Sequence, residues 1–94
     1  MSDHTPIQHL VKVTPENGLH LAPIAQLVRT ATAYSSAISL SFEGKRADVK
    51  SAFDLMLLGA PCGAELTLDV NGPDAPAAAA AITRLFESGF SQHP

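Results

Sequence analysis

The feature that most constrains the fold is how the spacing of apolar residues changes along the chain. Between residues 7 and 13 they alternate, which is the period of a strand with one buried face. From residue 21 the spacing switches to three and four, which is the period of an amphipathic helix. The two periods recur and predict seven elements, which are strands at 7–13, 37–42, 45–49 and 64–70 and helices at 21–31, 52–58 and about 75–88.

This order of elements, β-α-β-β-α-β-α, predicts an α+β fold. Each expected strand has one apolar face, and helices gathered on that face would bury it. We therefore expect a two-layer sandwich with the sheet in one layer and the helices in the other. The length of 94 residues suits a single domain over residues 1–94.

Several local signals refine the element boundaries. Ser51 followed by Asp54 resembles a capping box that opens the helix at 52–58, and Gly59 suits its end. Asp74 is expected to cap the last helix. On the short helix, Phe53 and Leu58 are expected to face the core.

The composition argues against several classes of function. Six lysines and arginines against nine acidic residues leave a net charge of −3, which does not suit binding to nucleic acid. Cys62 is the only cysteine, so neither an internal disulfide nor a cysteine metal cluster is possible, and we expect an inert loop thiol. A His4–His9 pair has no further ligand at sensible spacing, so no metal site is expected.

The chain also lacks the segments that direct a protein to a membrane or bind a nucleotide. No cationic stretch followed by a long apolar run opens it, and no apolar run reaches transmembrane length. We expect a cytoplasmic protein without membrane insertion. No Walker-type glycine loop occurs, so we expect no ATP site and no cofactor.

The stretch "NGLHLAP", residues 17–23, places a histidine where a helix begins. Asn17-Gly18 is turn chemistry, and Pro23 suits a first helical turn, so His20 lies at or next to the N-cap. Backbone N–H groups there lack partners and carry a partial positive charge, so they would meet a phosphoryl group on the imidazole. The same field favours a neutral ring, which is the nucleophilic form. The alternative is that His20 only caps the helix or packs against the turn.

The segment "NGLHLAPIAQLV" resembles the active-site segment of HPr, the histidine-containing phosphocarrier family of the bacterial phosphoenolpyruvate-dependent phosphotransferase system. That family's pattern is Asn-Gly-Leu-His, then Thr-Arg-Pro or Ala-Arg-Pro, then an apolar helix. The matching residues are Asn17, Gly18, Leu19, His20, Pro23, Ala25, Gln26 and Val28. A second block, "KSAFDLMLLG", is similar to the family's helix that starts with Lys-Ser. The resemblance covers roughly residues 7 to 88 and implies an open-faced β-sandwich, a four-stranded antiparallel sheet covered on one face by three helices.

The resemblance implies that His20 accepts a phosphoryl group from Enzyme I and passes it to an EIIA-type protein. The protein would then be a carrier rather than a stand-alone enzyme, with no small-molecule substrate of its own. The backbone N–H groups of Leu21 and Ala22, together with Asn17, would stabilise the phosphate.

One position departs from the family pattern. Ala22 stands where members usually carry an arginine that supplies a cation beside the phosphoryl group. We therefore expect transfer that is slower or that serves a different set of partners. The alternative function is a regulatory protein-binding module of the same fold, with weak or no phosphotransfer through His20.

Two further features carry both a structural and a functional interpretation. Ser51 aligns with a serine that HPr kinase phosphorylates in some bacteria; the favoured interpretation is a helix cap, and a regulatory phosphosite is the alternative. The residues Ala52, Met56 and Leu57 are expected to form an apolar patch next to Leu21 and Ala22, where family members dock their partners. The alternative is that Met56 or Leu57 faces the core.

Overall fold

The computed structural model describes residues 6–90 and has the predicted order of elements. The helices and strands are β1 (Ile7–Lys12), α1 (Leu21–Ala31), β2 (Ala37–Phe42), β3 (Lys45–Asp48), α2 (Ala52–Leu58), β4 (Glu65–Asn71) and α3 (Ala75–Glu87). The predicted boundaries agree with these to within a residue. The four strands form one antiparallel sheet in the order β1-β4-β2-β3.

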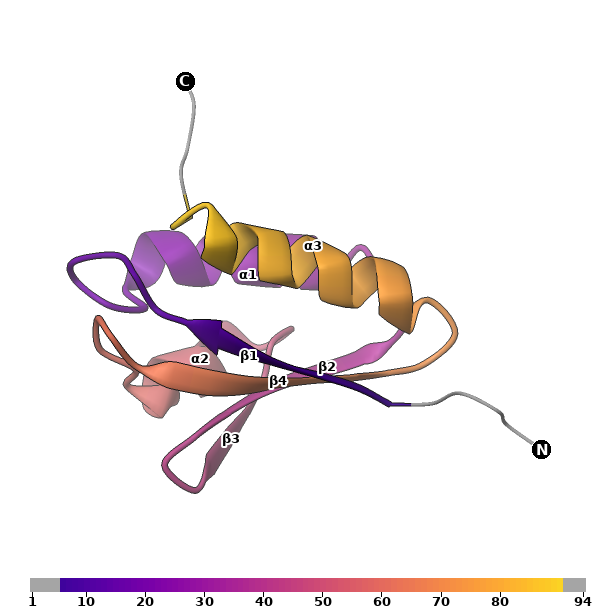
Figure 1. The fold of residues 1–94 in the computed structure, drawn as a ribbon, viewed down its shortest axis with the longest axis horizontal. Helices are drawn as coiled ribbons and strands as arrows, with labels where there is room; N and C mark the ends of the chain where they lie inside the picture. Colours follow the sequence, from indigo (N-terminus) through magenta and orange to yellow (C-terminus); the bar gives the residue numbers. More distant parts are fainter. Residues whose placement is uncertain (1–5, 91–94) are drawn as a thin grey trace.

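The sheet is open on one side and covered on the other. Helices α1 and α3 lie side by side over one face, while α2 packs against β3 and α1 near one end (Figure 1). The predicted α+β open-faced sandwich is therefore confirmed. Among residues 6–90, no helix is both long and apolar enough to cross a membrane.

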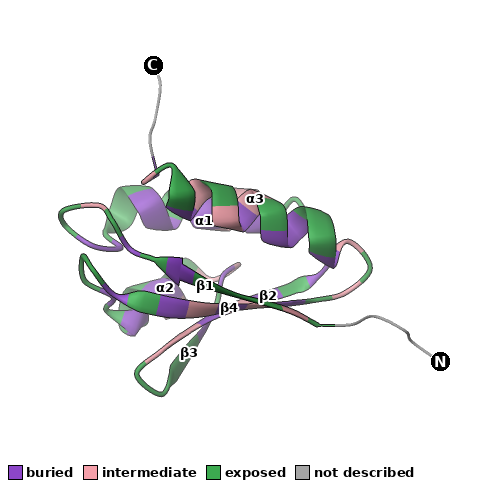
Figure 2. Ribbon diagram, in the orientation of Figure 1, coloured by how far each residue is buried: buried purple, intermediate pink, exposed green. Residues whose placement is uncertain are grey.

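The core fills the space between the helices and the sheet. Alternate residues of β4 are buried, and buried and exposed positions also alternate along α1 and α3 (Figure 2). This is the arrangement that the two apolar periods predict. The largest fully buried side chains from the sheet and the helices are Leu40, Leu66, Leu68, Val70, Ile24, Leu27, Leu55, Leu58 and Ile82.

The prediction that Asp74 caps α3 with its side chain is wrong. Asp74 occupies the N-cap position of α3 but makes no side-chain hydrogen bond to that helix. Its two carboxylate oxygens instead accept hydrogen bonds from the backbone N–H and hydroxyl groups of Ser35 and Ser36. The reason is proximity: Ala37 pairs with Asn71 across β2 and β4, which brings the segment before β2 against the start of α3.

The close approach of these two segments also requires Gly72. Its φ is +152°, and a Cβ built on it would lie 2.6 Å from the Cα of Ser36. Ser36 is only 1% exposed, and its hydroxyl also accepts a hydrogen bond from the backbone N–H of Asp74 at 3.2 Å. The Asp74 carboxylate therefore joins the chain before β2 to the beginning of α3.

We expect Asp74→Asn to lower the thermal midpoint at pH 7. Hydrogen bonds from the Ser36 hydroxyl and from Ser35 lower the pKa of Asp74 from 3.8 to about 2. A lowered pKa means that the charged carboxylate stabilises the fold above pH 3.8, and that this contribution is lost as the pH falls toward about 2. The midpoint difference between wild type and variant, followed by circular dichroism, should shrink over that range.

The matched control for this comparison is Glu87→Gln. Glu87 is an exposed residue of the same helix, and its side chain makes no hydrogen bond or ion pair within residues 6–90. A gap between wild type and Asp74→Asn that stays constant from pH 7 to pH 2 would contradict the role assigned to the Asp74 charge.

Candidate functional site

His20 is the N-cap residue of α1, as its position after the Asn-Gly turn predicts. Its backbone is extended, with φ −87° and ψ −171°, and its side chain is exposed and makes no capping hydrogen bond. The backbone carbonyl of His20 accepts the first helical hydrogen bond, from the N–H of Ile24 at 3.1 Å. The imidazole is therefore not used to cap the helix and is left free to react.

The first turn of α1 presents two unpaired backbone donors. The N–H groups of Leu21 and Ala22 have no hydrogen-bond acceptor within the described part of the chain. Pro23 has no N–H to offer, and the first turn contains no acidic residue that would compete for the donors. An anion held by the His20 ring would meet these two groups and the positive end of the helix dipole.

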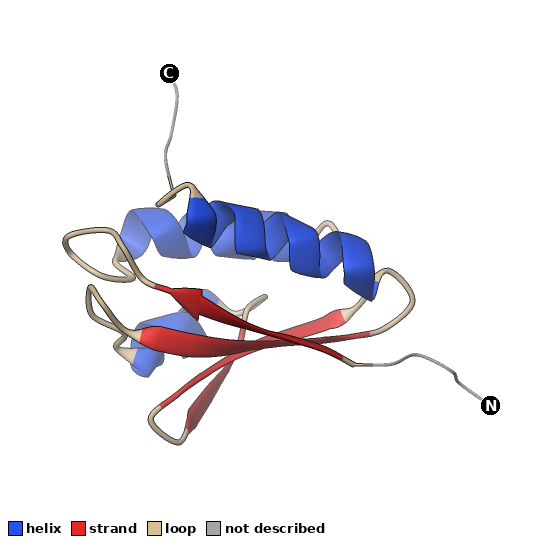
Figure 3. Cartoon of the chain, viewed as in Figure 1, coloured by secondary structure: helices blue, strands red, loops and turns tan. Residues whose placement is uncertain are grey.

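The loop that carries His20 is held in place by the loop between α2 and β4. The N–H of Leu19 donates to the carbonyl of Ala60 at 3.0 Å. Val13 exchanges two backbone hydrogen bonds with the same loop, accepting from Gly63 at 2.7 Å and donating to Ala64 at 2.9 Å. Figure 3 shows the two loops together at the left-hand end of the molecule.

Gly18 makes this close approach possible. Its φ is +70°, and a Cβ built on it would lie 2.6 Å from the carbonyl oxygen of Ala60 and 2.9 Å from the Cα of Pro61. Only glycine satisfies both conditions without strain. The glycine before the histidine thus has a structural reason to be there.

Asn17, the third predicted phosphate-stabilising residue, lies in the same loop. Its side chain is exposed and makes no hydrogen bond within residues 6–90. The structure therefore brings His20, Asn17 and the two free N–H groups of the first turn to one end of the molecule.

The outer surface of α2 carries apolar side chains, as predicted for Met56 and Leu57. Met56 is 59% exposed and Leu57 is 60% exposed, while Leu21 of α1 is 72% exposed. Ala22 and Ala52 are exposed as well. The alternative that Met56 or Leu57 faces the core is wrong.

The prediction that Phe53 faces the core is also wrong, because its side chain is 67% exposed. Leu58 does face the core, together with Leu55. Phe53 precedes Leu55 by two residues, which places it about 160° away around the helix. The spacing of Leu55 and Leu58 is the signal that indicates this orientation in the sequence. We call the exposed set the apolar patch, and its members are Leu21, Ala22, Ala52, Phe53, Met56 and Leu57.

Ser51 caps α2, as the favoured interpretation predicts. Its hydroxyl oxygen accepts a hydrogen bond from the N–H of Asp54 at 3.2 Å. The reciprocal half of a capping box is not formed, because the Asp54 carboxylate accepts from the N–H of Asp48 at 3.1 Å. Ser51 lies at the opposite end of α2 from the loop that holds Leu19.

One small hollow borders the apolar patch, since Leu57 lines it together with Lys45 and Arg46 of β3. A shallow hollow of about 790 Å³ is lined by residues such as Arg46, Asp48, Lys50 and Asp69, none of which belongs to the site. Cys62 is exposed, and its sulfur lies 3.6 Å from the carbonyl oxygen of Thr14. No group of three or more potential metal ligands occurs among residues 6–90.

The fold and the site define a class of protein: a small open-faced sandwich that presents an exposed histidine at the start of a helix. The family model described as the phosphorylation site of the HPr component of the phosphotransferase system matches residues 7–88. The chain belongs to the HPr family.

Individual proteins agree with the family assignment. The chain is 40% identical over 82 residues to phosphocarrier protein HPr of Treponema pallidum, covering 87% of this chain and 93% of that protein. It is 39% identical over 77 residues to the HPr of Vibrio cholerae, covering 82% and 91%.

Solved structures show the same fold. HPr-C-His of Thermoanaerobacter tengcongensis matches with a TM-score of 0.88 and 31% identity, over 94% of this chain and 99% of that one. HPr of Bacillus anthracis matches with a TM-score of 0.83 and 29% identity, over 87% and 98%.

We expect Gly18→Ala to destabilise the protein by about 3 kcal/mol, because it combines left-handed strain with overlap against the carbonyl of Ala60. The measurement is the free energy of unfolding in urea. Gly44→Ala is the matched control, since Gly44 has φ +80° but nothing within 4 Å of its added Cβ, and it should cost about 1 kcal/mol. Equal costs for the two variants would show that the close approach at Gly18 is unimportant.

Proposed function

We propose that this protein is a cytoplasmic phosphocarrier of the phosphotransferase system, which accepts a phosphoryl group on His20 from Enzyme I and passes it to an EIIA-type protein. The observation that carries the proposal is the exposed His20 ring, free of capping contacts, beside the unpaired N–H groups of Leu21 and Ala22. Membership of the HPr family supports it independently.

In the transfer step the main role of the carrier is to position the His20 ring in line with the phosphorus atom of the donor. A nitrogen of the neutral His20 ring attacks phosphorus on the donor, and the bond between phosphorus and the donor breaks as the new N–P bond forms. The electron pair of the broken bond stays with the donor. The same exchange then moves the group from His20 to the acceptor, so phosphate is neither hydrolysed nor lost.

The groups around His20 have distinct roles in this proposal. The N–H groups of Leu21 and Ala22 hold two phosphoryl oxygens, and the amide of the exposed Asn17 side chain supplies a further donor. The hydrogen bond from Leu19 to Ala60 and the two that join Val13 to Gly63 and Ala64 hold the loop in place, so these donors do not need to reorganise when the group arrives.

The apolar patch is the surface that we assign to partner docking. Large apolar side chains exposed together on so small a protein mark a binding surface. Methionine adapts its shape readily, which suits a surface that meets a donor and an acceptor in turn.

Two further proposals concern regulation. Ala22 favours the second candidate function, a regulatory protein-binding module in which His20 transfers little or no phosphate. Ser51 is a secondary candidate for phosphorylation by an HPr kinase, since the start of α2 would attract the added charge while the Asp54 carboxylate would oppose it.

We expect Enzyme I and phosphoenolpyruvate to add one phosphoryl group to the wild-type protein, in an acid-labile and base-stable form that mass spectrometry detects. His20→Ala should abolish the addition. The control His9→Ala changes another exposed histidine, on β1, and should be labelled like wild type. Labelling that survives His20→Ala would overturn the assignment, and an unlabelled wild type would favour the regulatory module.

We expect Leu57→Ser to lower kcat/KM for this phosphorylation about tenfold, because it removes a large exposed apolar side chain from the proposed docking surface. Leu10→Ser is the matched control: Leu10 is 69% exposed, against 60% for Leu57, but belongs to β1 rather than to the patch. Equal effects of the two substitutions would contradict docking through the apolar patch.

A further inference from the structure

A buried polar side chain joins the helix that carries His20 to the segment that follows α3. Gln26 is 8% exposed and is the only polar residue among the buried positions of α1. Its side-chain amide donates a hydrogen bond to the backbone carbonyl of Phe90 at 3.2 Å. Apolar contacts alone would bury this face of α1, so burial of the core does not explain an amide at this position.

The acceptor of this hydrogen bond has an unusual backbone conformation. Phe90 has φ +59°, a left-handed value that is strained for a residue with a bulky side chain. Its N–H donates to the carbonyl of Leu85 at 2.9 Å, and its ring packs edge-to-face on Phe86 with the ring centroids 4.8 Å apart. Such strain persists only where the surrounding contacts require it, and Gln26 makes one of those contacts.

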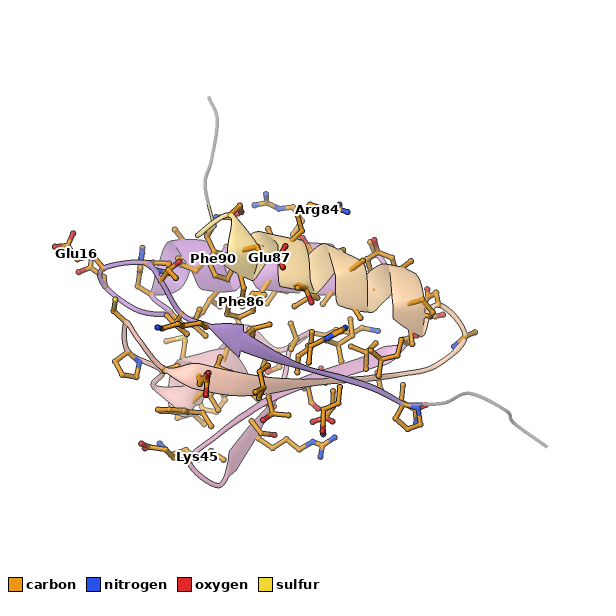
Figure 4. The ribbon with its side chains drawn as sticks, in the orientation of Figure 1. Glu16, Lys45, Arg84, Phe86, Glu87 and Phe90 are labelled. Carbon is orange, nitrogen blue, oxygen red and sulfur yellow. The ribbon has the colours of Figure 1, made fainter. Side chains whose placement is uncertain are left out.

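The strained segment lies at the same end of the molecule as His20. Figure 4 shows Phe86 and Phe90 below the end of α3, towards the loop that carries Glu16 and leads to His20. Gly89 lies against that loop, because a Cβ built on it would be 3.2 Å from the Oγ1 of Thr14. The end of α3 therefore contacts both the loop before His20 and the helix after it.

The hydrogen bond from Gln26 restricts α1 in a way that apolar contacts do not. Apolar contacts are non-directional, whereas a hydrogen bond fixes the direction as well as the distance between its two groups. A rotation or slide of α1 would move its first turn, which carries His20 and the free N–H groups of Leu21 and Ala22. The rate of a transfer reaction depends steeply on such positions, and a misplacement of about 1 Å can cost about a hundredfold.

We propose that Gln26 is a positioning residue for phosphoryl transfer. Its hydrogen bond to the Phe90 carbonyl fixes the orientation of α1, and with it the direction of the His20 ring and of the two free N–H groups. This inference rests on the proposed function. Gln26 is buried, so it acts through the helix and not by contact with the phosphoryl group.

The test compares wild type with Gln26→Met in the phosphorylation of His20 by phosphoenolpyruvate and the Enzyme I encoded in the same genome. Methionine is similar in length and volume to glutamine but cannot donate the hydrogen bond. We expect kcat to fall about fivefold while KM stays within about twofold, because the exposed side chains of the apolar patch are unchanged.

The matched control is Gln8→Met. The Nε2 of Gln8 also donates a hydrogen bond, to Asp69 at 2.8 Å, but Gln8 is an exposed residue of β1. Its loss should leave kcat at the wild-type value. The amide resonances of Leu21 and Ala22, followed by NMR in the unphosphorylated protein, should move in Gln26→Met and stay in place in Gln8→Met.

Phe90→Leu separates positioning from stability. It removes the ring contact with Phe86 but keeps the backbone carbonyl that accepts from Gln26. The thermal midpoint should therefore fall while kcat stays near the wild-type value. A fall in kcat as large as that of Gln26→Met would show that the rate follows stability, and would overturn the inference.

Two other results would also overturn the inference and leave the proposed function standing. They are a kcat of Gln26→Met equal to that of wild type, and a rise in KM with kcat retained. A wild-type protein that the active Enzyme I does not label would overturn the proposed function, and with it the role of Gln26 in transfer. The resonances of Leu21 and Ala22 test the orientation of α1 without Enzyme I, and unmoved resonances in Gln26→Met would contradict it.

Discussion

The site depends on the backbone hydrogen bonds that join the loop of residues 13–20 to the loop of residues 59–64. Backbone hydrogen bonds at Val13 and Leu19 join the two loops, and Gly18 lets them approach within contact distance. Because the second loop follows α2 directly, the same contacts set the position of His20 and bring the end of α2 beside it. The same backbone hydrogen bonds therefore position both His20 and the neighbouring surface of α2.

The two ends of the molecule are tied by different chemistry. At the end with His20 the ties are neutral backbone hydrogen bonds, and the side chains stay free. At the other end the Asp74 carboxylate accepts hydrogen bonds from Ser35 and Ser36, so a charged side chain connects the segment before β2 to the start of α3. At the end with His20, the donors available to an anion are therefore the backbone N–H groups at the start of α1.

Much of the fold follows from apolar spacing and turn residues. The order of elements, the open-faced sandwich and the caps at His20 and Ser51 are predictable, because each depends on residues within one turn or one strand. The prediction for Asp74 fails because its best hydrogen-bond donors come from a segment 38 residues earlier in the chain. The prediction for Phe53 fails because Leu55 and Leu58 are the residues of α2 that face the core, and Phe53 lies on the opposite side of the helix from Leu55.

The same distinction applies to the candidate site. The sequence by itself determined that a histidine begins a helix after an Asn-Gly turn, that the N–H groups of Leu21 and Ala22 follow it, and that no arginine stands at position 22. Only the tertiary structure decided that the two N–H groups stay unpaired, that Phe53 is exposed, and that Lys45 and Arg46 of β3 lie beside Leu57. The physical reason is range: capping and periodicity act between near neighbours in the chain, whereas exposure and charge environment depend on which distant segments pack together.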